Sequence, residues 1–268
     1  MCVPKGAPVT FEIDLTGKRA LITGAGQGVG LATAHALASA GAEILVNDIR
    51  AEQADVAVAE LLAAGGNAVA LPFDVTSWEQ VSNAMGGAGT VDILVNNAGN
   101  AGAQGFTGMV SFVDSDPADW QRFFAVNLFG VMHCTRAALP SMIEAGSGRI
   151  ITIISDAARN GEAKLSSYAA AKAGAAGFSR SIAREVGRHA ITVNCISLGN
   201  INTPTTAPPP PSTPEEHERE KAFLRPYVIR RRGLPDDVAG LVTYLASPLA
   251  EWITGQTYGL NGGYTFSQ

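Results

Sequence analysis

The sequence predicts a single α/β domain in which a doubly wound parallel sheet of about seven strands carries helices on both faces. Short apolar runs that are typical of buried strands alternate along the chain with longer segments of helical periodicity. Glycines end several of these segments, as strand-to-helix turns require. No internal repeat and no change of composition marks a second domain, so we expect one domain over residues 1–268.

Each element is predicted from its own pattern and its boundary residues. The first strand is the apolar run KRALIT, and Gly41 ends the helix that follows it. The expected strands are residues 18–23, 43–47, 68–73, 91–95, 149–154, 192–196 and 257–260. The expected helices are residues 27–40, 51–64, 117–145, 166–187 and 235–247, with an acidic helical stretch at 215–221.

Composition and charge exclude several classes of function. A net charge of −5 argues against nucleic acid or an anionic membrane as the main partner. No apolar run reaches the roughly 18 residues of a spanning helix, and the N-terminus has no run of signal-peptide length, so we expect a cytoplasmic protein.

Cysteine and histidine usage predicts no metal site. Cys2, Cys134 and Cys195 have no CxxC spacing, and the last two stand in apolar segments, which favours buried free thiols. The four histidines are scattered. We therefore expect no metal ligand among these residues.

The segment TGAGQGVG, residues 23–30, lies between the first strand and the first helix. Its glycines allow a tight turn and a close approach of the backbone to a pyrophosphate. The N–H groups of the helix N-terminus then face the phosphates. The alternative is a tight turn without a ligand. Expected dinucleotide contacts in this turn are Thr23, Gly24, Gln27, Gly28, Val29 and Gly30.

Asp48 ends the second expected strand, about 20 residues after the glycine turn. A carboxylate there accepts hydrogen bonds from both adenosine ribose hydroxyls and repels the 2′-phosphate of NADP, which favours NAD. The alternative is a helix N-cap ahead of Ala51, and the nearby Arg50 would weaken the discrimination. Asp74 and Val75 close the third expected strand, where the adenine would lie.

Five short motifs occur in an order that resembles the short-chain dehydrogenase/reductase family, in its shorter branch, from about residue 15 to 264. They are TGxxxGxG (Thr23, Gly24, Gly28, Gly30), NNAG (residues 96–99), an asparagine on the long helix (Asn127), a serine (Ser155) and YxxxK (Tyr168, Lys172). The serine precedes the tyrosine by thirteen residues. The resemblance implies a Rossmann-type fold and an oxidoreductase that uses NAD or, less favoured here, NADP.

The resemblance also implies further cofactor contacts. They are Asn97, Ala98 and Gly99 after the fourth strand, Gly199, Ile201 and Thr203 after the sixth, and Tyr168 and Lys172 themselves. Two positions depart from the family pattern. Leu198 stands where a proline usually precedes the glycine, and Asn261 stands where an aspartate is common before the double glycine.

Tyr168 and Lys172 are four residues apart on a predicted helix and therefore share one face. A phenol with a pKa of about 10 is a poor base at neutral pH, and a nearby ammonium lowers that pKa. Tyr168 can then act as the acid/base, while Ser155 orients the substrate oxygen. The resemblance adds that Lys172 binds the nicotinamide ribose and that Asn127 supports a proton relay through water.

Substrate choice is expected in the loops. The proline-rich residues 203–214 are either a surface linker or a mobile lid. The resemblance places the substrate loop here, which favours a lid over about residues 203–227. Lys164 and Asp156 are further loop residues that we expect at the substrate pocket. The three arginines at 230–232 either meet substrate phosphates or pair across subunits.

The sequence thus predicts hydride transfer between NAD and a secondary alcohol or ketone that is apolar, cyclic or acyl-thioester-linked. Alternatives are a 3-oxoacyl-carrier-protein or CoA reductase that uses NADPH, and a dinucleotide-sensing regulator without turnover. Such a regulator would be expected to lose one of the three catalytic side chains, and all are present. The family resemblance further implies a homotetramer or homodimer.

Overall fold

The computed structural model describes residues 12–100, 109–204 and 207–266, and its centre is one seven-stranded sheet. The strand order is β3-β2-β1-β4-β5-β6-β7, and every neighbouring pair is parallel. The expected α/β architecture is confirmed.

The bounds of the elements follow the predicted ones closely. The strands are β1 (Arg19–Ile22), β2 (Glu43–Val46), β3 (Asn67–Ala70), β4 (Ile93–Asn96), β5 (Gly148–Ser155), β6 (Ile191–Leu198) and β7 (Thr257–Leu260). The helices are α1 (Gly28–Ser39), α2 (Ala51–Ala63), α3 (Trp78–Ala88), α4 (Pro117–Phe124), α5 (Gly130–Ala145), α6 (Ala157–Asn160), α7 (Ser166–Val186), α8 (Pro214–Leu224) and α9 (Pro235–Ala246).

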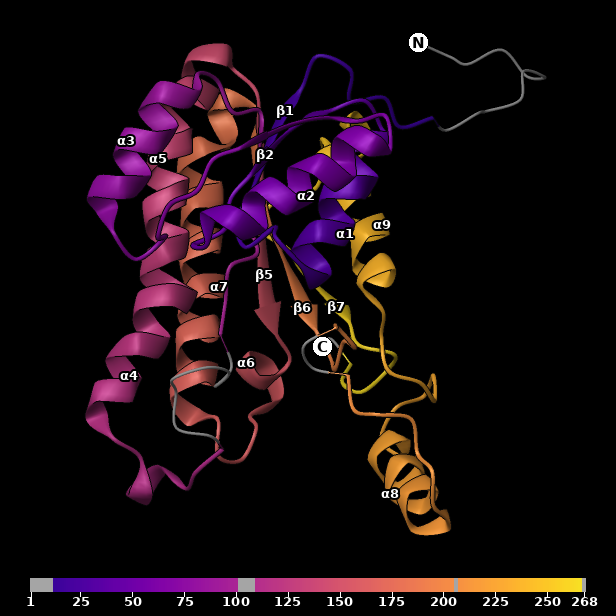
Figure 1. Cartoon of the computed structure of the whole chain (residues 1–268). Helices are drawn as coiled ribbons and strands as arrows, with labels where there is room; N and C mark the ends of the chain where they lie inside the picture. The colour runs from indigo at the N-terminus through magenta and orange to yellow at the C-terminus, as the bar shows by residue number, and fades with distance from the viewer. Residues whose placement is uncertain (1–11, 101–108, 205–206, 267–268) are drawn as a thin grey trace, which may run out of the picture.

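Helices cover both faces of the sheet (Figure 1). On one face, α1, α2 and α9 pack against the strands through a core that includes Leu37, Leu61 and Val242. On the other face, α3, α5 and α7 do so through a core that includes Met85 and Met142. The strands are apolar on both sides because both sides are buried, as is usual for parallel sheets.

The strand order reverses at β1, which pairs with β2 on one side and with β4 on the other. The loops that leave β1 and β4 therefore diverge to opposite faces, and this arrangement predicts a crevice at the carboxyl ends of the strands. Ligands of open α/β sheets bind at such switch points. The glycine turn and the NNAG segment both follow strands that meet at this crevice.

The helix α3 was not predicted from the sequence. Its residues include Gly86 and Gly87, which lower the helix propensity of the segment. The helix forms because the Ser77 side chain caps it by accepting a hydrogen bond from Gln80 N (3.3 Å), and because Val81 and Met85 bury one face. Tertiary packing thus outweighs weak local propensity.

The predicted long helix at 117–145 is interrupted. A π-helical turn, η2 (Ala125–Phe129), lies between α4 and α5, and Asn127 is in this turn. Such turns are often found at functional sites. The third strand is also shorter than predicted, because it ends at Ala70 and places Asp74 in the following loop.

The two cysteines that the structure describes, Cys134 and Cys195, are buried free thiols, as expected, while Cys2 lies outside the described residues. Among the helices of the described ranges, none is long and apolar enough to cross a membrane.

The fold generates a test of its core. Ile151 lies on the central strand β5 and is 1% exposed, so Ile151→Ala should lower the free energy of unfolding by about 3 kcal/mol. Urea denaturation followed by circular dichroism measures the loss. Val69→Ala, on the edge strand β3 at 48% exposure, is the control and should cost less than about 1 kcal/mol. Equal losses would contradict the assigned core.

Candidate active site

The turn between β1 and α1 requires glycine at several positions. Gly24 and Gly28 have φ angles of +63° and +58°, in the left-handed region that glycine favours. A Cβ on Gly30 would overlap the Gly24 carbonyl oxygen and lie 2.7 Å from Asn97 Nδ2. The backbone of the turn is therefore packed too closely for a side chain.

No side chain of the N-cap residue caps the backbone N–H groups at the N-terminus of α1. Its N-cap residue, Gln27, makes no side-chain capping hydrogen bond, and no acidic residue stands in the first turn. By contrast, α3, α4 and α8 are capped by Ser77, Asp116 and Thr213. An uncapped helix N-terminus behind a glycine turn is suited to an anion, and a pyrophosphate fits this chemistry.

Thr23 and Asn97 join the glycine turn to the NNAG segment. The Thr23 hydroxyl oxygen accepts hydrogen bonds from Asn97 N and Ala98 N, both at 3.0 Å. The Asn97 amide donates to Thr23 O (2.9 Å) and Gly24 O (3.1 Å). These two side chains build the turn and bring Ala98 and Gly99 beside it, so they shape the predicted cofactor site through the backbone.

Asp48 faces the glycine turn. It is 7% exposed, and its Oδ2 lies 2.7 Å from the position that a Cβ on Gly26 would take. Its Oδ1 accepts a hydrogen bond from Arg50 N (3.1 Å). Because the N-cap of α2 is Arg50, Asp48 is not the cap that the alternative interpretation required.

Asp74 and Val75 lie in the loop before α3. The Asp74 carboxylate accepts hydrogen bonds from Thr76 N and Oγ1, both at 2.8 Å. Val75 is 8% exposed, and its carbonyl is 2.9 Å from His133 Nδ1. Asp74 thus stabilises its own turn, and its contact with an adenine stays a prediction.

The segment after β6 returns to the same crevice. Gly199 N donates to Leu260 O (3.2 Å), and Ile201 bridges to Gly233. A Cβ on Gly28 would lie 3.3 Å from Thr203 Cγ2, so Thr203 lies against the glycine turn. The strand continues regularly through Leu198, so the missing proline leaves this path intact.

Ser155 and Tyr168 are brought together from two elements. Ser155 is the last residue of β5, and Tyr168 lies in the first turn of α7. Ser155 Oγ accepts a hydrogen bond from Ala157 N (3.2 Å). Burial raises the pKa of Tyr168, and the Ser155 hydrogen bond acts in the opposite direction.

Lys172 is buried one turn further along α7, at 3% exposure. Its Nζ donates to Ile153 O (2.8 Å) and lies 5.9 Å from the centre of the Tyr168 ring. Burial lowers the pKa of Lys172 to about 8, and a weaker effect of Cys195 opposes this. The ammonium form therefore still prevails at neutral pH, beside the phenol.

Asn127 closes the cluster from η2 and is fully buried. Its Nδ2 donates to Asn100 O and Phe123 O, both at 3.0 Å, and its Oδ1 accepts from Asn100 N (3.1 Å). A Cβ on Gly99 would be 3.0 Å from both Asn127 Oδ1 and Lys172 Nζ. The side chain thus fixes the NNAG turn next to Lys172.

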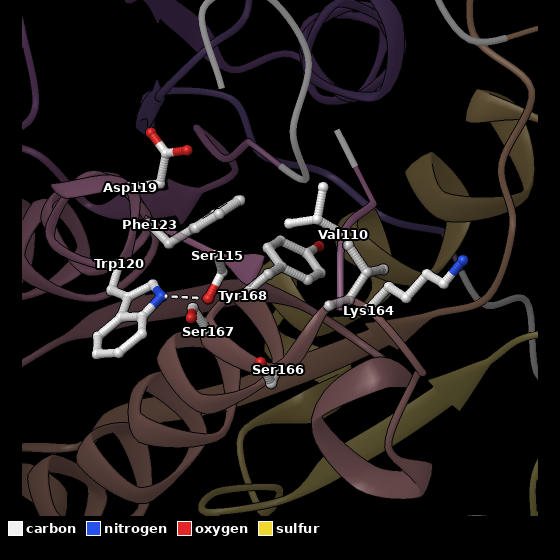
Figure 2. Close-up of a pocket in the computed structure, with 10 residues that line it drawn as sticks. Val110, Ser115, Asp119, Trp120, Phe123, Lys164, Ser166, Ser167 and Tyr168 are labelled. Carbon is white, nitrogen blue, oxygen red and sulfur yellow. Dashed lines mark hydrogen bonds between the residues drawn. The ribbon is translucent and has the colours of Figure 1, made fainter. Parts of the chain in front are cut away.

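A pocket opens beside Tyr168 (Figure 2). Phe123 meets the Tyr168 ring edge-on, at 6.2 Å between centroids. The sequence did not identify Phe123 as a pocket residue, although it lies one helical turn before Asn127. Lys164 lines the pocket, but its amine extends away from Tyr168 in Figure 2. Further lining residues are Val110, Ser115, Asp119, Trp120, Leu165, Ser166 and Ser167.

The arginines at 231 and 232 make ion pairs within the chain. Arg232 binds Glu220 of α8 through Nε (3.0 Å) and Nη2 (2.7 Å), and Arg231 binds Asp237 at 2.6 and 2.8 Å. Arg232 also stacks on Phe223 (3.9 Å). The sequence suggested substrate phosphates or a second subunit as partners, whereas here one arginine attaches α8 to the domain.

The glycine turn is tested by Gly30→Ala. The added methyl group cannot fit without a backbone shift, so the free energy of unfolding should fall by about 2 kcal/mol. Gly87→Ala in α3 is the matched control, because its Cβ meets open space and should raise stability by about 0.5 kcal/mol. Urea denaturation measures both. A neutral Gly30→Ala would show that the turn tolerates a side chain.

Comparison with known proteins agrees with this geometry. The family model described as short chain dehydrogenase matches residues 18–212. The chain is 40% identical over 256 residues to the 7alpha-hydroxysteroid dehydrogenase of Escherichia coli K12, covering 94% of this chain and 96% of the relative. It is 37% identical over 255 residues to the 3-oxoacyl-[acyl-carrier-protein] reductase of Synechocystis, covering 93% and 97%.

A similar solved structure is a 7 alpha-hydroxysteroid dehydrogenase complexed with NADH and 7-oxo glycochenodeoxycholic acid. Its TM-score is 0.84 at 38% identity, and the match covers 94% of this chain and 96% of the other. Fold, motif order and similarity over nearly the whole length agree. The chain therefore belongs to the short-chain dehydrogenase family.

Proposed function

We propose that this chain transfers a hydride between NAD and the carbon of a secondary alcohol or ketone, with Tyr168 as the acid/base. The observation that carries the proposal is the placement of Tyr168 in the first turn of α7, beside Ser155 at the end of β5 and with its ring centre 5.9 Å from the buried Lys172 Nζ. Two elements, β5 and α7, place an orienting hydroxyl, a base and a buried cation together, and a buried cation is costly to maintain without a chemical role.

The cofactor is proposed to bind along the crevice at the switch point. The pyrophosphate would lie on the uncapped N-terminus of α1, at Gln27, Gly28 and Val29. The adenosine ribose would hydrogen-bond to Asp48. Thr203, Gly199 and Ile201 would border the nicotinamide end, since they return to the same crevice. The relative solved with NADH supports NAD as the cofactor.

Bound NAD supplies the hydride acceptor and, when oxidised, a positive ring. In alcohol oxidation, the Ser155 hydroxyl holds the substrate oxygen next to Tyr168. Tyr168 Oη removes the hydroxyl proton, and the Lys172 ammonium stabilises the phenolate that accepts it. In the reverse direction Tyr168 returns the proton. A relay from Lys172 to solvent past Asn127 is part of the proposal.

An apolar, cyclic substrate is favoured over an acyl thioester. Phe123, Trp120, Val110 and Leu165 form the apolar part of the lining of the pocket beside Tyr168, and serines, Asp119 and Lys164 form its polar part. Ring systems bury much apolar area against such side chains. The 7alpha-hydroxysteroid dehydrogenase relative supports this class, whereas the carrier-protein reductase relative supports the alternative. Residues 203–227, which include α8, are proposed as the lid.

A homotetramer or homodimer in the cytoplasm completes the proposal. Trp252 is 96% exposed, and Phe129, Met132 and Leu249 are each more than a third exposed. Large apolar side chains at the surface are typical of contacts between subunits. Size-exclusion chromatography with light scattering measures the mass directly.

The proposed chemistry is tested with purified protein and NAD⁺ against hydroxysteroids, cyclic alcohols and 3-hydroxyacyl-CoAs. Turnover is followed by the absorbance of reduced nicotinamide. Tyr168→Phe should lower kcat at least about 100-fold, since it removes the acid/base but keeps the ring. Its NAD affinity, measured by calorimetry, should fall far less than kcat, because Tyr168 is one of many expected cofactor contacts. Unchanged turnover in Tyr168→Phe would refute the proposed base.

Cofactor choice is tested by Asp48→Ser. Loss of a charged hydrogen-bond partner should weaken NAD binding about tenfold and improve NADP binding, because the repulsion of the 2′-phosphate is removed. Asp55→Ser, on the exposed face of α2, is the matched control and should change neither affinity. An unchanged ratio of NAD to NADP affinity would mean that Asp48 does not face the ribose.

A further inference from the structure

Asp156 is a buried acid that directly follows Ser155. It is 3% exposed and is not among the residues that line the pocket beside Tyr168, although the sequence offered it to the substrate. Its carboxylate points instead toward β6 and the segment that follows β7. Oδ1 accepts a hydrogen bond from the Ser197 hydroxyl (2.6 Å), and Oδ2 accepts from Asn261 Nδ2 (2.5 Å) and Thr265 Oγ1 (2.9 Å).

These bonds join the residue after β5 to two segments that are distant from it in sequence. Ser197 belongs to β6, Asn261 follows β7, and Thr265 belongs to the C-terminal segment. The backbone of Asp156 adds a fourth tie, because its N–H donates to Leu198 O (2.9 Å). The residue after Ser155 is thus fixed to the neighbouring strand β6 and to the segment that follows β7.

The surroundings suit a carboxylate better than another group. Its two oxygens only accept, and hydroxyl and amide donors face both of them. Arg159 Nη1 lies 3.6 Å from Oδ1 and supplies a positive charge from α6. A buried acid without such partners would be strongly destabilising, so the cluster is arranged around this one side chain.

We propose that Asp156 is a positioning residue for the reaction: it holds the end of β5 so that the Ser155 hydroxyl stays within hydrogen-bond reach of Tyr168 and of the substrate oxygen. This inference rests on the proposed roles of Ser155 and Tyr168. The glycine turn follows β1, two strands away from β5, so loss of the Asp156 carboxylate should affect the chemical step more than pyrophosphate binding.

Removal of the carboxylate tests the proposal. Asp156→Ala should lower kcat about 10- to 100-fold through misplacement of Ser155, with NAD affinity within about twofold of wild type. Asp156→Asn should keep most of the activity, because its amide oxygen still accepts from Asn261 and Thr265 while its NH₂ donates to the Ser197 hydroxyl. Asp92→Ala, which removes hydrogen bonds at the amino-terminal ends of β1 and β4, far from Ser155, is the control.

If Asp156→Ala folds poorly, the same proposal is tested by exchanging the carboxylate of Asp156 and the amide of Asn261, which are hydrogen-bonded to each other. Asn261→Asp places two carboxylates face to face and should lower kcat about tenfold or more. Adding Asp156→Asn to that variant restores a donor–acceptor pair and should recover most of the loss. Circular dichroism and denaturation of each variant separate catalytic from folding defects.

The outcomes distinguish this inference from the proposed function. Wild-type kcat in Asp156→Ala, in an enzyme that Tyr168→Phe inactivates, overturns the positioning role and leaves the function standing. Equal losses of kcat and of NAD affinity would also overturn the positioning role, because they would show that Asp156 supports the fold as a whole. A double variant no faster than Asn261→Asp also refutes it. Turnover that survives in Tyr168→Phe would instead refute the proposed function.

Discussion

The parallel pairing of β1 with β4 is the constraint on which the rest of the site depends. It places the glycine turn and the NNAG segment side by side, because both follow strands that end at the same edge. Thr23 and Asn97 then lock the two segments through four hydrogen bonds to backbone groups. The crevice between them is therefore rigid before any ligand binds, which spares much of the ordering cost of binding.

The second half of the site is built around buried polar groups. Lys172 and Asn127 lie in the interior, where each polar atom must find a partner. Ile153 O holds Lys172, while Phe123 O and the backbone of Asn100 hold Asn127. These partners come from β5, the α4–η2 helix and the loop after β4. The site consequently joins elements from both halves of the sheet. In the same way, the buried carboxylate of Asp156 joins the end of β5 to β6 and to the C-terminal segment after β7.

The proposed lid, residues 203–227, is held to the domain by surface contacts, whereas the site that it is proposed to cover is held by buried hydrogen bonds. The helix α8 has no buried residue and projects from the body of the domain (Figure 1). Its described side-chain ties to the domain include the ion pair of Glu220 with Arg232 and the stacking of Arg232 on Phe223. Arg232 also donates to Asn200, in the segment that borders the proposed nicotinamide end. A helix that is held by so few contacts can shift at low cost, whereas the buried cluster cannot.

The sequence by itself determined the fold class, the seven strands in their order along the chain and the identity of the candidate residues, because these follow from periodicity, glycine placement and motif spacing within short segments. Tertiary structure alone decided what depends on contacts between distant segments. It formed α3 where local propensity was weak, inserted a π-helical turn at Asn127, and turned Asp156 away from the pocket. It also paired Arg232 with Glu220. A residue's neighbours across the sheet are set by packing and hydrogen-bond satisfaction, which no local pattern records.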